Sequence, residues 1–232
     1  MGEVGVQRRG PLAQLWHVGF ESVRPVRAFP SYRGQRSFSG RWWSATTGRH
    51  VGFESWLERD HLMLLDRDPV VVGIASQPFG LSWVEEGGRR RRHVPDYFAR
   101  LADGSGLVVD VRPDEQIEAR DAAAFAATAQ ACAAVGWQYR RVGGLDAVVV
   151  ANLRWLAGYR HRRCRDTVVA DALVGEFGEP RPLAEGAAAA GDRLCVLSTL
   201  FHLLWAGVLH AELGSAPLSG STVVTAAAGW MS

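Results

Sequence analysis

The stretch from residue 56 to residue 142 orders its helical and extended patterns in a way that few fold classes allow. A helix is predicted at its start, because Ser55 precedes Glu58 by three positions in the capping-box pattern and apolar residues follow at helical spacing. Segments rich in β-branched residues come next. An alanine-rich segment over 114–134 predicts a second helix, and 137–142 predicts another strand. The order helix, strands, helix, strand predicts a mixed α/β core.

The strand segments include a hairpin that carries acidic residues. The predicted strands are 70–76, 81–86, 91–101 and 107–112. A glycine-rich turn joins the last two. If this hairpin is centred on Gly104, Asp96 lies opposite Arg112 and Phe98 lies opposite Asp110. Asp96, Asp110 and Arg112 then share one face of the sheet, because alternate residues of a strand point to the same side. A one-residue change of register would move Asp96 to the other face.

These side chains suit phosphodiester chemistry. Two carboxylates from the hairpin and a third, Glu58, from the preceding helix can form an oxygen-ligand site for Mg²⁺ or Mn²⁺. Such an ion activates water and stabilises charge in the transition state, and Arg112 would stabilise the same charge. Each residue also has a structural interpretation: Glu58 as a capping carboxylate, Asp96 as a strand-end residue after Pro95, and the other pair as a solvated edge. The seven histidines have no paired spacing, so a histidine metal site is not predicted.

Composition excludes some chemistry and indicates a compartment. All 26 basic residues are arginine, so mechanisms that need a lysine from this chain are excluded. The net charge of +2 does not by itself indicate nucleic acid. Four consecutive arginines, Arg89, Arg90, Arg91 and Arg92, suit contacts to DNA phosphates, although a solvated arginine-rich face is the alternative. Three widely spaced cysteines, with no signal-peptide pattern and no apolar stretch long enough to span a bilayer, predict a cytoplasmic protein without a membrane partner.

The pattern changes after residue 165. The later segments are predicted, in order, to be a helix, a Pro/Ala/Gly connector, an apolar helix and short extended pieces: 166–177, 179–192, 194–205 and 208–224. They predict a small C-terminal unit over 166–232, for which a winged-helix-like module is one arrangement. Residues 1–40 mix arginine, glycine and proline with scattered aromatics and are predicted to form an N-terminal extension of short strands and loops.

Longer motifs resemble a nuclease family. Pro95-Asp96 followed by Asp110-Val111-Arg112 resembles the PD-(D/E)XK signature of restriction-endonuclease-like nucleases. The segments FESWLERDHLMLLDRDPVVVGIASQPFGL (53–81) and HVPDYFARLADGSGLVVDVRP (93–113) resemble TnsA, the endonuclease subunit of heteromeric transposases. The resemblance covers residues 41–160 and is faint beyond them. It implies a restriction-endonuclease-like mixed sheet flanked by helices over 1–165 and a helical, winged-helix-like partner-binding domain over 166–232.

The resemblance also implies a function and a site. Members cut the non-transferred strand at transposon ends, in double-stranded DNA, together with a TnsB-like DDE transposase and a TnsC-like ATPase. By position, Glu58, Asp96 and Asp110 match the family's metal-binding acids or their neighbours, with Glu54 as a fallback for Glu58. Arg112 matches the family's lysine. An arginine does not release its proton near neutrality, so its implied role is to hold a phosphate oxygen or polarise a water.

Two other functions stay open from the sequence. One is a catalytically silent DNA-binding or assembly subunit that keeps the nuclease fold. The arginine at position 112 favours that hypothesis, whereas the presence of all three acids argues against it. The other is a winged-helix regulator whose C-terminal unit recognises DNA by itself.

Overall fold

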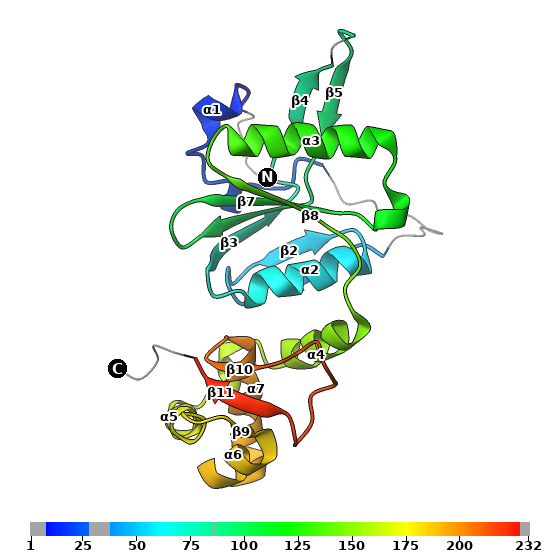
Figure 1. Ribbon diagram of the computed structural model, residues 1–232. Helices are drawn as coiled ribbons and strands as arrows, with labels where there is room; N and C mark the ends of the chain where they lie inside the picture. The colour runs from blue at the N-terminus through cyan, green and yellow to red at the C-terminus, as the bar shows by residue number, and fades with distance from the viewer. Residues whose placement is uncertain (1–7, 28–37, 86, 228–232) are drawn as a thin grey trace.

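The N-terminal part of the protein is built around a mixed sheet with a helix on each face (Figure 1). The computed structural model describes residues 8–27, 38–85 and 87–227. The sheet has the order β3-β6-β7-β8, in which only the β7–β8 pair is parallel. Its strands are β3 (Val71–Ser76), β6 (Tyr97–Leu101), β7 (Gly106–Val111) and β8 (Gln138–Val142). Helix α2 (Trp56–Arg67) covers one face and α3 (Ala119–Ala133) the other. The predicted mixed α/β core is confirmed, and it fits a nuclease fold.

Strand alternation gives each face of the sheet its own apolar core. The core on the α2 face includes Leu62, Leu65, Tyr97, Ala99 and Val109. The core on the α3 face includes Phe20, Phe98, Val108, Cys132 and Trp137. Because the central strands are buried on both sides, they read as nearly continuous apolar runs.

Smaller elements complete the N-terminal part. They are α1 (Leu12–Leu15), the 3₁₀ turn η1 (Phe20–Ser22), and the hairpin of β1 (Gly40–Trp43) and β2 (His50–Phe53). The hairpin is the pair of extended pieces predicted around Thr47-Gly48. Residues 1–7 and 28–37 of the predicted N-terminal extension lie outside the described residues.

The predicted register of the acidic hairpin is wrong by two residues. Phe98 lies opposite Val108 rather than Asp110, and continuing this register places Asp96 opposite Asp110 rather than Arg112. The cause is the turn. The Gly104 amide donates to the Leu101 carbonyl, which closes the turn one residue earlier than predicted. Because the difference is an even number of residues, the predicted alternation of faces is kept.

The segment predicted as one strand over 91–101 is divided. Its first part is β5 (Arg90–His93), which pairs with β4 (Leu81–Val84) in a separate hairpin. The chain leaves this hairpin at Pro95, which has no N–H to donate to a ladder, and β6 then begins at Tyr97.

Two helix boundaries also differ from the prediction. The helix predicted over 114–134 begins later than expected. Its first predicted residues form the 3₁₀ turn η2 (Asp114–Gln116), and α3 begins only at Ala119. The helix predicted between Asn152 and His161 is α4 (Ala147–Ala157). It begins earlier because the Asp146 carboxylate accepts the Val148 N–H as its N-cap.

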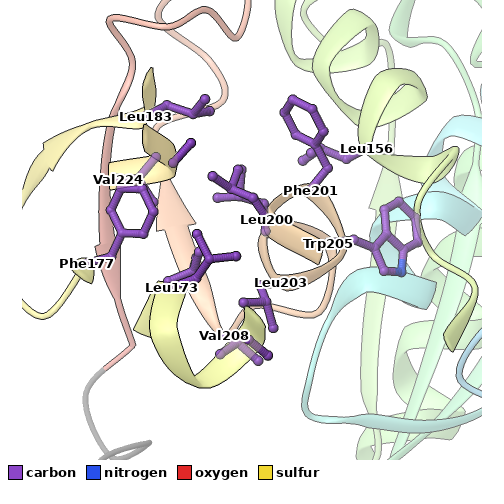
Figure 2. Packing of buried hydrophobic residues seen from close by; sticks show 14 of the residues in the cluster. Leu156, Leu173, Phe177, Leu183, Leu200, Phe201, Leu203, Trp205, Val208 and Val224 are labelled. Carbon is purple, nitrogen blue, oxygen red and sulfur yellow. The ribbon is translucent and has the colours of Figure 1, made fainter. Parts of the chain in front are cut away.

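The C-terminal unit combines helices with a small antiparallel sheet of order β10-β11-β9. After the 3₁₀ turn η3 (Arg162–Cys164), its elements are α5 (Thr167–Glu176), β9 (Arg181–Pro182), α6 (Leu183–Ala190), α7 (Arg193–Trp205), β10 (Leu209–Ala211) and β11 (Val223–Ala226). The prediction of a connector over 179–192 is wrong, because β9 and α6 form there. Figure 2 shows Leu200 and Leu203 of α7 in the centre of its core, with Phe177 and Val224 on the far side.

This core continues into the N-terminal part. Leu156 of α4 and Met63 of α2 belong to the same buried cluster. Trp205 of α7 points toward the N-terminal part in Figure 2, where its ring lies 6.3 Å from that of Trp42. The boundary after residue 165 stays a prediction. Both apolar packing and hydrogen bonds cross it, among them those from the Asn152 side chain to the Leu213 and Ala216 carbonyls. None of the helices in the described ranges is long and apolar enough to cross a membrane.

Candidate active site

Glu58 lies in the first turn of α2, where the sequence places it. The Ser55 hydroxyl oxygen accepts the Glu58 N–H, which makes Ser55 the N-cap as predicted. The Glu58 carboxylate in turn accepts the Glu54 N–H at 2.7 Å and the Ser55 hydroxyl at 3.0 Å. Glu58 therefore does cap its helix. Burial raises the pKa of its carboxyl.

Asp96 lies one residue before β6 and connects the predicted acids. Its Oδ2 accepts the Val111 N–H at 2.7 Å. Burial first, and then the negative charges of Glu58 and Asp110, raise the pKa of Asp96 well above its usual value. The other two predicted acids, Glu58 and Asp110, are thus within electrostatic range of Asp96.

Glu54 belongs to the same acidic group, although the sequence predicted it only as an alternative to Glu58 as a metal ligand. Its charge contributes to the raised pKa values of both Glu58 and Asp96. One of its oxygens, Oε2, pairs with Arg27 at 2.6 Å. The other, Oε1, is buried and has no hydrogen-bond partner in the described part of the chain. A buried carboxylate oxygen without a partner is costly, so this group has unused capacity to bind a donor or a cation.

Asp110 is buried on the α3 face of the sheet, where two side chains hold it. His93 Nε2 lies 2.9 Å from each of its carboxylate oxygens, and the Tyr139 hydroxyl donates to Oδ2 at 2.9 Å. Burial and then the Asp110 charge raise the pKa of Tyr139, and the same causes raise the pKa of the Cys132 thiol to about 12. Neither His93 nor Tyr139 was predicted from the sequence to belong to the site. Tyr139 of β8 lies two residues after the buried Trp137, and this spacing indicates its face but not its partner.

Arg112 follows β7, and its guanidinium contacts groups near the start of α3 rather than Asp96 or Asp110. Its Nη2 donates to Asp121 at 3.3 Å, and its Nε donates to the Gln116 carbonyl at 3.3 Å. The guanidinium therefore connects the end of β7 to the beginning of α3, and its side chain is 37% exposed. At that exposure it remains accessible to a bound anion.

The acidic group offers oxygen ligands but is not a closed metal site. Within the ranges that the structure describes, no group of three or more His, Cys, Asp or Glu side chains is arranged to hold a metal ion as it stands. The side chains nevertheless fit a hard divalent cation, because they are all carboxylates, burial and neighbouring negative charges raise the pKa values of Glu58 and Asp96, and Glu54 Oε1 lacks a donor. A cation would offset that repulsion.

The four consecutive arginines lie at the tip and along β5 of the β4–β5 hairpin. Arg89, Arg90 and Arg92 are exposed, and Arg91 Nε pairs with Glu85 at 2.7 Å. At the base of the hairpin a shallow pocket of about 170 Å³ opens against the first turns of α3, with Trp83, His93 and Arg120 among its lining residues. The base of this hairpin adjoins the acidic group, because β5 ends at His93, which contacts Asp110.

The central part of the chain is similar to a known protein family. Residues 68–143 match the family model described as TnsA-like endonuclease N terminal. This segment is similar to the N-terminal domain of TnsA-like endonucleases. The segment runs from before β3 to the end of β8, so it contains Asp96, Asp110 and Arg112 but not Glu58. No curated protein matches the chain. The match confirms the resemblance seen in the sequence and indicates a nuclease of the transposase type.

Proposed function

We propose that this protein is the metal-dependent DNA endonuclease subunit of a heteromeric TnsA/TnsB/TnsC-type transposase, which hydrolyses a phosphodiester of the non-transferred strand at transposon ends. One observation carries the proposal: the TnsA-like domain includes the hairpin of Asp96 and Asp110, and the Asp96 carboxyl interacts electrostatically with Glu58 of the adjoining helix.

In this proposal Glu58, Asp96 and Asp110 hold a Mg²⁺ or Mn²⁺ ion, with Glu54 beside them. The ion would supply water activation and stabilisation of the charge that develops on the phosphate. His93 and Tyr139 keep the Asp110 carboxylate in place. A carboxylate has about four lone-pair sites, so these donors leave capacity for a cation.

The arginines hold the substrate. Arg112 can exchange its 3.3 Å contact with Asp121 for a phosphate oxygen, because the two groups are partly exposed and their separation is long for a charge-assisted bond. It cannot act as a general base. Arg89, Arg90, Arg91 and Arg92 are proposed to lie on the DNA side of the same domain.

The C-terminal unit is proposed to be a winged-helix-like partner-binding domain. Two observations support this proposal: from α5 onward the element order is helix, strand, helix, helix, strand, strand, and β11 lies between β9 and β10 in the sheet. A TnsB-like DDE transposase and a TnsC-like ATPase are the proposed partners, and double-stranded DNA at the transposon ends is the proposed substrate.

The test is strand cleavage by the reconstituted complex. The full-length protein, the transposase and the ATPase are combined with a labelled duplex that carries a transposon end, in Mg²⁺ or in EDTA. We expect cuts in the non-transferred strand in Mg²⁺ and none in EDTA. A complex that assembles on the end and leaves that strand intact in both Mg²⁺ and Mn²⁺ would contradict the proposal and support a catalytically silent assembly subunit.

A further inference from the structure

The β4–β5 hairpin forms an arm that extends from the body of the protein beyond α3 (Figure 1). Its register places Ser82 opposite Arg92, Trp83 opposite Arg91 and Val84 opposite Arg90. Because directly opposite residues share a face and successive residues alternate, the arm has two different faces. Its four arginines therefore do not act as one group.

The inner face is occupied by contacts within the protein. Trp83, Arg91 and His93 are partly buried and line the pocket against α3, at whose edge the exposed Arg92 also lies. Arg91 pairs with Glu85 across the arm, and His93 contacts Asp110 of the sheet. This face fixes the arm to the domain that carries the acids.

The outer face is exposed and cationic. Ser82, Val84, Arg90 and Arg92 are all exposed, and Val84 is 61% exposed. Within the described ranges Arg90 and Arg92 have no ion pair, whereas Arg91 has one. Near the tip, no described atom lies within 4 Å of a Cβ added at Gly87 or Gly88, apart from their chain neighbours, so nothing packs against these two residues.

We propose that the arm lies in the major groove of duplex DNA, with Arg90 and Arg92 contacting phosphates while Arg91 holds the arm together. This inference rests on the proposed function. The major groove, about 12 Å wide, admits a two-stranded ribbon. A two-stranded arm whose outer face carries Arg90 and Arg92, neither of them in an ion pair within the described ranges, fits the anionic groove in shape and charge. The arm also fixes where the duplex lies, because only Val94 and Pro95 separate its last residue from Asp96.

The test measures DNA affinity against salt, in EDTA so that no strand is cut. The test variant is Arg90→Gln/Arg92→Gln in the full-length protein. The matched control, Arg49→Gln/Arg193→Gln, removes the same charge from exposed positions outside the arm. Each lost phosphate contact lowers the slope of log K against log salt by about one, so the test variant should lose about two and the control almost nothing. Equal slopes for wild type and test variant, with unchanged melting temperatures, would overturn the inference.

A second probe identifies the groove. A duplex whose major groove is filled by glucosylated 5-hydroxymethylcytosine should bind the wild type only as well as the test variant binds ordinary DNA. Undiminished binding of the wild type to the filled duplex would overturn the groove assignment. A test variant with normal DNA binding and lost binding to the transposase would instead identify the arm as a protein-binding surface. In either of these failures, metal-dependent cutting of transposon ends by the wild type would leave the proposed function standing.

Discussion

The Asp96→Asn variant is expected to fold and assemble normally and to lose strand cleavage by at least about 100-fold, because a metal ion in such a site supplies several kcal/mol of transition-state stabilisation. The amide keeps the size of the side chain, and its oxygen can still accept the Val111 N–H. Burial already disfavours the charged form of Asp96, so removing the charge should not lower the melting temperature. Single-turnover cleavage by the reconstituted complex, measured beside thermal unfolding, tests this.

A matched control lies at the other end of the same hairpin. Asp103 is in the turn, where its carboxylate accepts the Ser105 N–H and hydroxyl. The Asp103→Asn variant makes the same chemical change away from the acidic group and should cut at the wild-type rate. Cleavage by Asp96→Asn that equals cleavage by Asp103→Asn would remove Asp96 from the site.

The largest expected effect on stability is at Asp66, near the end of α2. This carboxylate is 5% exposed and accepts four hydrogen bonds, from Trp42 Nε1, Ser44 Oγ and the amides of Ala45 and Thr46. The Asp66→Ala variant leaves these donors without an acceptor. Each hydrogen bond to a charged group contributes about 1.5–3 kcal/mol, and the contributions are not additive, so the free energy of unfolding should fall by about 3–5 kcal/mol. Urea denaturation measures it.

Asp68 provides the comparison for this variant. Its carboxylate accepts only the exposed Val70 N–H, so Asp68→Ala should lower the free energy of unfolding by about 1 kcal/mol. If Asp66→Ala costs no more than Asp68→Ala, the hydrogen bonds of Asp66 do not anchor the β1–β2 hairpin to α2. That outcome would also weaken the argument that α2, which carries Glu58, is held firmly against the sheet.

The features that the sequence predicts well are local. Ser55 caps α2 because the capping signal spans only three residues. The alternation in β7 places Val109 on one face and Asp110 on the other whatever the exact register. The resemblance to TnsA depends on local signals as well, since it rests on contiguous motifs in α2 and in the strands that follow it.

The features that the sequence does not predict depend on distant partners. Asp66 reads as a residue near a helix end, and its four donors come from a hairpin about 20 residues earlier in the chain. The contact of Asp110 with His93 and Tyr139 needs the pairing of β7 with β8, for which the sequence has no local signal. It also needs the chain to break between β5 and β6, where Pro95 is a signal for the break but not for the contact that follows from it. Arg112 contacts Asp121 because α3 begins later than its composition indicates.

The most direct test of the central claim is a calorimetric titration of the full-length protein with Mg²⁺, repeated on Asp96→Asn. The proposed site predicts saturable binding to the wild type, and binding weakened at least about tenfold in the variant, because the amide replaces a charged ligand in a group of carboxylates. Equal Mg²⁺ binding by the two proteins, or none by the wild type, would contradict the assignment of Glu58, Asp96 and Asp110 as a metal site.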